Sequence, residues 1–206
     1  MLVSREELGV AVLDNCIYAV GGKNGAYVLN IVEIFDTSNQ KWKMVTSIST
    51  NRHDLDVGVL NNRLYVVGGA DGKCALKSVE YYDPTLDTWT PVAEMSVSRQ
   101  GVGVGVLDGL MYAIGNYNGK DLKSVEVYIP SDGVWSSVAD MHFSRIWPVA
   151  ALDGLLYVMS GEESESVVDT VEIYNPITNT WTLEPFSRNE ERVYGGVVID
   201  KPPYYT

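Results

Sequence analysis

The chain has 206 residues, of which 27 are Asp or Glu and 15 are Lys or Arg, so its formal net charge is −12. Nucleic acids and anionic membrane surfaces attract basic proteins, so this charge disfavours both as partners. With 46% hydrophobic residues, 13 Tyr, five Trp and 19 Gly, the composition excludes a disordered chain and favours β-strands joined by tight turns.

The sequence repeats with a period of 46 or 47 residues, which is typical of repeat folds. Tryptophan and arginine each return at this spacing. The repeated positions are Trp42, Trp89, Trp135 and Trp181, and Arg5, Arg52, Arg99 and Arg145. They divide one domain, 1–206, into four units at approximately 5–51, 52–98, 99–144 and 145–191.

The residue pattern of each unit predicts four short strands in the same order. In the first unit, a strand rich in Gly and Val is expected at 9–13, and a hairpin turn follows at 14–15. A second strand then runs into the glycine pair at 21–22, a third strand with alternating residues is expected at 32–36, and a fourth strand is headed by Trp42. The later units repeat this order, with first strands at 56–60, 101–107 and 148–152, and third strands at 79–83, 125–129 and 171–175.

A four-stranded unit cannot bury both of its faces alone, so the repeats are expected to stack around an axis as a β-propeller. After the fourth unit, Arg192 is followed by VYGGVVID, a fifth copy of the first strand. We therefore predict one additional strand at 192–200. An open arc of such units is also expected to leave apolar faces exposed.

The order of an apolar strand, Tyr, Gly-Gly, Val-Glu-x-Tyr and Trp resembles the Kelch repeat, although Asn116 and Ser160 each replace a glycine of the pattern. Met95 and Met141 stand four residues before an arginine, as in the Kelch-like proteins with an N-terminal BTB domain. The resemblance implies an all-β Kelch β-propeller with four complete four-stranded blades plus one C-terminal closing strand. Because the family usually has six blades, the chain is expected to be an incomplete six-bladed ring from a larger protein. A true four-bladed ring is the alternative.

No catalytic, cofactor or metal site is predicted. The segment from His53 to Asp56 offers fewer than the three or four convergent ligands that zinc usually needs. The glycine-rich run at 101–105 leads into a strand, whereas phosphate binding needs a helix N-terminus. The acidic run at 162–165 is expected to be a solvated loop. The chain is therefore expected not to be an enzyme.

Residues that recur in every unit are interpreted as structural, because a binding residue rarely needs an identical copy in each blade. This structural interpretation applies to the recurrent glutamates. It also applies to the recurrent arginines, although these border the loops of the family's binding surface. The loops that differ between units are the expected binding surface, since loops on a rigid scaffold carry specificity. The candidate partner-binding residues are Asn24, Arg52, His53, Asp71, Arg99, Gln100, Asn118, Arg145, Ile146, Trp147 and Glu162. Trp147 is either an interface anchor or a packing residue beside Pro148.

The resemblance to BTB–Kelch proteins implies the substrate-recognition part of a cullin–RING ubiquitin ligase. In that arrangement the Kelch loops capture a protein substrate, and a BTB domain, which this chain does not contain, contacts the cullin. The alternative implied by the resemblance is an actin-binding cytoskeletal Kelch protein that binds F-actin. Two cysteines cannot make a disulfide framework, and no apolar run reaches bilayer length, so a cytoplasmic protein is expected, with the cytoskeleton included.

Overall fold

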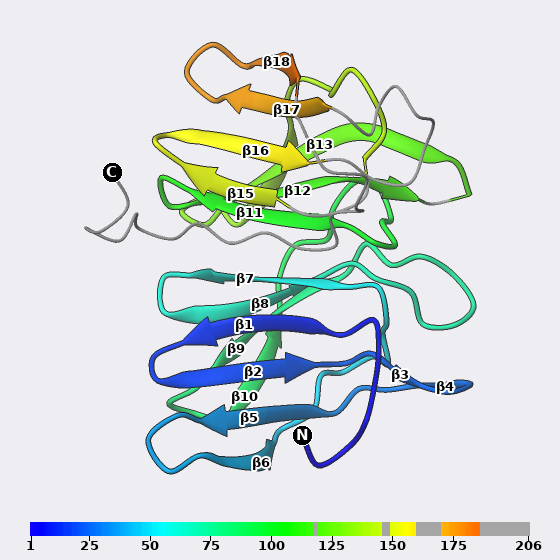
Figure 1. Ribbon diagram of the computed structural model, residues 1–206, viewed down its shortest axis with the longest axis vertical. Helices are drawn as coiled ribbons and strands as arrows, with labels where there is room; N and C mark the ends of the chain where they lie inside the picture. The colour runs from blue at the N-terminus through cyan, green and yellow to red at the C-terminus, as the bar shows by residue number, and fades with distance from the viewer. Residues whose placement is uncertain (118, 146–148, 160–169, 186–206) are drawn as a thin grey trace.

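The structure is a computed structural model (Figure 1), and it describes residues 1–117, 119–145, 149–159 and 170–185. These residues form four antiparallel four-stranded sheets and one two-stranded hairpin. They contain strands and turns, and among them there is no helix of the length and hydrophobicity that a membrane crossing requires. The predicted all-β fold with four strands per unit is confirmed. The predicted strand at 192–200 lies outside the described residues.

Each four-stranded sheet is called a blade here, and the blades are numbered along the chain. Blade 1 contains β1 (Gly9–Leu13), β2 (Cys16–Val20), β5 (Val32–Asp36) and β6 (Lys41–Val45), and blade 2 contains β7 (Asp56–Leu60), β8 (Arg63–Val67), β9 (Val79–Asp83) and β10 (Thr88–Pro91). Blade 3 contains β11 (Gly103–Leu107), β12 (Leu110–Tyr117), β13 (Asp121–Ile129) and β14 (Val134–Ser137). Blade 4 contains β15 (Val149–Leu152), β16 (Leu155–Met159), β17 (Thr170–Asn175) and β18 (Thr180–Pro185). The hairpin of β3 (Lys23–Asn24) and β4 (Tyr27–Val28) projects from the loop between β2 and β5, and the sequence pattern did not predict it.

The first strand of each blade is its inner strand, and neighbouring inner strands contact one another. β1 contacts β7, β7 contacts β11, and β11 contacts β15. Figure 1 shows these strands near the middle of the molecule, with the outer strands β6 and β18 at opposite ends of the view. Glycine permits this close approach, because a Cβ at Gly58 would lie 2.9 Å from Cγ1 of Val104 in the next blade.

The turns between the first two strands of each blade use residues that tolerate a positive φ. Asn61 and Asn62 have φ values of 50° and 57°, and Asp108 and Gly109 have values of 50° and 75°. Two consecutive residues with positive φ make the hairpin turn whose twist matches that of the strands. The predicted Asp/Asn/Gly turns are therefore present, and they fix the strand register.

The hydrophobic core is divided among the three boundaries between successive blades. Each boundary has its own cluster of buried side chains drawn from two neighbouring blades. A pair of tyrosine rings crosses each boundary, with centroids 5.8 to 6.0 Å apart. The pairs are Tyr18 with Tyr82, Tyr65 with Tyr128, and Tyr112 with Tyr174. The stability of each blade thus depends on its neighbours, as in other repeat folds.

Candidate protein-binding face

The loops from the fourth strand of one blade to the first strand of the next meet the loops between second and third strands. Glu6 and Lys23 exchange two backbone hydrogen bonds, and the pair of His53 with Ala70 repeats this one blade later. The amide of Asp54 donates to the carbonyl of Glu7 at 3.0 Å, so loops of neighbouring blades are also joined to each other. These backbone bonds give the loops a fixed geometry.

A buried arginine–glutamate pair lies beneath the loops of every blade. Both side chains in each pair are at most 8% exposed, and their N–O distances run from 2.7 to 3.1 Å. The pairs are Arg5 with Glu33, Arg52 with Glu80, Arg99 with Glu126, and Arg145 with Glu172. In three of the four blades the arginine Nη1 also donates to the carbonyl of a glycine at the same position of the repeat. Gly21 and Gly68 directly follow β2 and β8, and Gly115 lies within β12.

The glutamate of each pair binds a second loop, because it accepts backbone N–H groups of the loop that precedes the arginine. Glu126 accepts from Ser96 at 2.7 Å and from Val97 at 3.3 Å. Burial pushes the pKa of Glu126 upward, but the hydrogen bonds from Ser96 and the bond from Arg99 outweigh it and hold the pKa below its usual value. Burial also lowers the pKa of Arg99, against the attraction of Glu126. The arginine–glutamate pair therefore holds the loop that precedes the arginine against the loop between the second and third strands, beneath the surface.

This geometry places three candidate binding residues inside the blades. Arg52, Arg99 and Arg145 are 0%, 0% and 1% exposed, and their guanidinium groups are used by internal bonds. Their side chains do not form part of the surface, which agrees with the structural interpretation of the repeated arginines. The sequence could not show on which side of the loop these side chains lie.

A polar network links the loops of three blades at the surface. Glu7 bonds Lys23 Nζ at 2.5 Å through Oε1, and its Oε2 lies 2.8 Å from Nδ1 of His53. Nδ1 of His53 also lies 3.2 Å from Oδ2 of Asp54, and this same oxygen accepts a hydrogen bond from Gln100 Nε2 at 2.9 Å. Burial alone would raise the pKa of Glu7, but its bonds to Lys23 and His53 lower it.

Three of these groups could in principle ligate a metal ion, because potential ligand atoms of Glu7, His53 and Asp54 lie within 4.8 Å of one another. Glu7 and Asp54, however, already accept bonds from the ammonium group of Lys23 and the side-chain amide of Gln100, respectively. The observed bonds thus describe an ion-pair and hydrogen-bond network. The expectation that the chain holds no metal stays a prediction.

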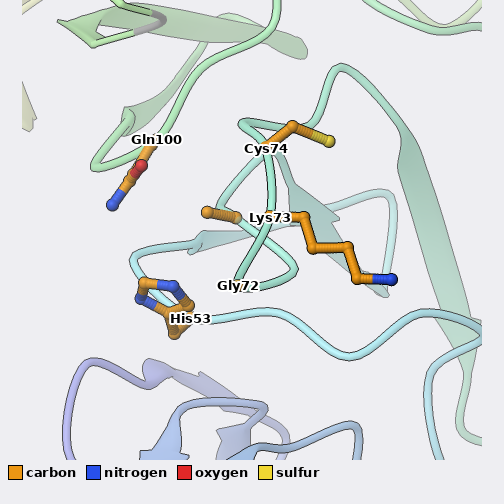
Figure 2. Close-up of a pocket in the computed structure, with 6 residues that line it drawn as sticks. His53, Gly72, Lys73, Cys74 and Gln100 are labelled. Atoms are coloured by element: carbon orange, nitrogen blue, oxygen red, sulfur yellow. The ribbon is translucent and has the colours of Figure 1, made fainter.

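A pocket of about 190 Å³ lies beside this network (Figure 2). Its lining residues are His53, Ala70, Gly72, Lys73, Cys74 and Gln100. The loop at 70–74 is shaped by Asp71, whose Oδ1 accepts the amides of Lys73 at 2.8 Å and Cys74 at 2.9 Å. These bonds also lower the pKa of Asp71, the bond from Cys74 most strongly. Figure 2 shows His53 and Gln100 on one side of the loop, while Lys73 and the Cys74 Sγ point away from His53.

The structure brings together some of the predicted binding residues. His53 and Gln100 line one pocket, and Asp71 shapes the loop that completes it. Asn24 is exposed at the β3–β4 hairpin and does not line this pocket. The remaining candidates, Asn118, Ile146, Trp147 and Glu162, lie outside the described residues.

The sequence interpretation missed Glu7, Lys73 and Cys74 as members of this surface. Glu7 could have been found by aligning the units, because it occupies the position of Asp54 in the first repeat. Both residues have positive φ values, 55° for Glu7 and 50° for Asp54. Lys73 and Cys74 lie in a loop of variable sequence, where the repeat provides no guide.

The stacked four-stranded blades define a β-propeller type of repeat protein. The chain belongs to the Kelch family: the family model described as Kelch motif matches residues 4–49, 51–96, 98–142 and 148–185. A segment of 45 residues is 40% identical to the Kelch repeat and BTB domain-containing protein 2 of cowpox virus (strain GRI-90 / Grishak). That match covers 22% of this chain and 8% of the viral protein.

The fold is also similar to a solved structure, that of YjhT, with a TM-score of 0.75. The similarity covers 91% of this chain and 67% of the YjhT chain. Sequence identity is 17%, so the likeness concerns the fold.

Proposed function

We propose that this chain is a protein-binding Kelch module, and that it serves as the substrate-recognition part of a BTB–Kelch adaptor for a cullin–RING ubiquitin ligase. The observation that carries the binding role is the pocket formed by His53, Gln100 and the loop at 70–74. It offers hydrogen-bonding groups from two loop types, and the buried arginine–glutamate pairs hold those loops in place. Groups fixed in advance lose little conformational entropy on binding, which favours recognition of a partner.

The adaptor role is supported by the name of the viral relative, which combines Kelch repeats with a BTB domain. In such an adaptor the Kelch blades would bind the substrate, and the BTB domain would bind the cullin. The substrate is therefore expected on the loop face, and the cullin contact is expected outside this chain.

The binding role is tested with a charge reversal on the loop that lines the pocket, Lys73→Glu, and the same reversal on the outer strand β6, Lys41→Glu. Lys41 is exposed and lies outside the pocket lining. Quantitative affinity purification should recover at least one protein whose yield falls about tenfold with Lys73→Glu and is unchanged with Lys41→Glu, since a lost charged contact contributes about 1.4 kcal/mol or more. If the yield falls equally with both variants, or falls with neither, binding at this pocket is contradicted.

The adaptor role is tested on the captured protein. Its purification with a cullin, and its slower degradation in cells that carry Lys73→Glu, are the expected results. Co-sedimentation of the gene product with F-actin in the absence of any cullin would reject the adaptor role and select the cytoskeletal alternative.

A further inference from the structure

His53 and Gln100, which lie on one side of the pocket loop, are each held by a carboxylate at one of their two polar ends (Figure 2). Nδ1 of His53 lies 2.8 Å from Glu7 Oε2 and 3.2 Å from Asp54 Oδ2. Gln100 donates from Nε2 to the same Asp54 oxygen at 2.9 Å. Because an ionised carboxylate only accepts hydrogen bonds, Nδ1 of His53 carries the proton in these contacts.

These contacts determine which atoms of the two side chains remain available to a bound partner. In a neutral imidazole one ring nitrogen is a donor and the other is an acceptor, so Nε2 of His53 is an acceptor. The amide nitrogen of Gln100 is used by Asp54, which leaves the carbonyl oxygen Oε1 as a second acceptor. In the described part of the chain neither atom has a hydrogen-bond partner. Two residues that line the pocket thus each provide an unused acceptor.

The charges beside these acceptors favour a cation. Three carboxylates, those of Glu6, Glu7 and Asp54, belong to the loops that hold His53. One cation, Lys23, bonds Glu7 and lies 3.9 Å from Glu6. Three negative charges and one positive charge give this surface a net charge of −2. The net charge of −12 on the whole chain also attracts a basic partner during its approach.

The pocket loop itself adds no net charge, because it carries one anion, Asp71, and one cation, Lys73. The Asp71 carboxylate is occupied by amides of its own loop. Figure 2 shows the Lys73 side chain pointing away from His53. The ammonium group of Lys73 therefore leaves the two acceptors accessible to a positive group of the partner.

We propose that the pocket binds an arginine side chain of the partner protein, an inference that rests on the proposed binding function and names the group that is recognised. A guanidinium presents five N–H donors in one plane, so it can reach Nε2 of His53 and Oε1 of Gln100 together. The carboxylates strengthen both contacts, because their bonds on the far side of the imidazole and the amide polarise these groups toward the acceptor atoms. A carboxylate of a partner would instead place an acceptor against two acceptors.

Protonation of His53 should weaken this contact. The second proton of an imidazole binds to the free ring nitrogen, so Nε2 changes from an acceptor to a charged donor, and histidine is the side chain that ordinarily makes this change between pH 5 and 8. The charged groups of the neighbouring loops are Glu6, Glu7, Lys23, Asp54, Asp71 and Lys73. Despite burial, the bond from Lys23 holds the pKa of Glu7 below its usual value. The amide of Cys74 likewise lowers the pKa of Asp71, so both carboxylates stay ionised in this range.

The test is an NMR titration of the 206-residue chain with N-acetyl-arginine amide and with N-acetyl-citrulline amide, which has nearly the same shape but no charge. The chain has two histidines, so a His142→Gln variant identifies the imidazole signals of His53. The arginine derivative should shift these signals at pH 7.5 with a dissociation constant on the order of 1 mM, and the citrulline derivative should bind about tenfold more weakly. Lowering the pH to 5 should weaken arginine binding about tenfold.

Two variants assign the acceptors. Gln100→Leu removes Oε1 and should weaken arginine binding about tenfold, whereas Gln40→Leu, at an exposed position of the β5–β6 turn, should not change it. His53→Gln should abolish the difference between the two pH values. Burial raises the pKa of Asp56 to about 6, so this group also titrates in the range, and a pH dependence that persists in His53→Gln overturns the assignment of the acceptor to Nε2. Near-ultraviolet circular dichroism confirms that the variants remain folded.

The proposal is overturned if the arginine derivative leaves the His53 signals unchanged up to about 50 mM, if citrulline binds equally well, or if binding is stronger at pH 5. It is also overturned if nitrogen chemical shifts of His53 at pH 7.5 show the proton on Nε2. These results are separate from capture of the partner. If Lys73→Glu lowers capture while the arginine titration fails, the pocket binds a different group, and if arginine binds while Lys73→Glu leaves capture unchanged, the proposed function fails.

Discussion

Replacing Arg99 by methionine should destabilise the protein strongly, because the side chain connects blade 3 to the preceding loop from a fully buried position. Its Nη1 donates to the carbonyls of Gly115 at 2.9 Å and Ser124 at 2.8 Å, and its Nη2 lies 3.0 Å from Glu126 Oε1. Methionine fills similar space but leaves a buried carboxylate without its cation and two carbonyls without a donor. Breaking a buried pair in this way costs about 3–5 kcal/mol of unfolding free energy.

An exposed ion pair provides a control of matched geometry. Lys77 Nζ lies 2.8 Å from Glu94 Oε2, which is as close as the Arg99 pair, but both side chains are about half exposed at 54% and 51%. Lys77→Met should therefore cost less than about 1 kcal/mol. The difference between the two substitutions isolates the effect of burial from that of distance.

The assay is urea-induced unfolding followed by tryptophan fluorescence at neutral pH. The double variant Arg99→Met/Glu126→Leu should be more stable than Arg99→Met, because the uncompensated charge is then absent. If Arg99→Met fails to fold while the double variant folds, the same reasoning holds. An Arg99→Met variant as stable as Lys77→Met, or a double variant less stable than Arg99→Met, would refute it.

Three further predictions concern single positions. Gly68→Ala should lower the melting temperature in thermal unfolding far more than Gly109→Ala. Both glycines have a positive φ, but the added Cβ would lie 2.6 Å from a backbone oxygen at Gly68 and would meet nothing within 4 Å at Gly109. Burial raises the pKa of Asp56 to about 6, so the neutral acid present below the unfolded pKa near 4 is compatible with folding, and its ionisation opposes folding as the pH rises through 6. Asp56→Asn should accordingly raise the melting temperature at pH 7.5 and leave it nearly unchanged at pH 4, and an equal effect at both pH values would contradict this. Trp135→Phe should cost about 1–2 kcal/mol more than Trp42→Phe in urea unfolding of the monomeric chain, because the Trp135 indole has a carbonyl partner across a blade boundary.

The sequence predicted the repeated strands and turns well and predicted the loops that differ between repeats poorly. Period-2 alternation and Asp/Asn/Gly turns predicted the strands, because a strand that buries one face admits few other patterns. The β3–β4 hairpin was not predicted, since it occurs in one blade and has no counterpart to align. The role of Glu7 in the surface network was also missed: aligning the units places it with Asp54 and Gly101, but the sequence alone does not predict that a glutamate there adopts φ 55°.

The adjacent residues Arg52 and His53 explain how one loop provides both scaffold and binding surface. In extended backbone, successive side chains point to opposite sides. The arginine enters the blade and pairs with Glu80, so the next residue must face the loop surface, where His53 lines the pocket. Arg99 and Gln100 repeat this division one blade later. Since the arginine is needed in every blade to clamp the loops, it cannot vary, whereas the residue after it is free to change. The binding specificity of the face is therefore expected at the positions that directly follow the buried arginines.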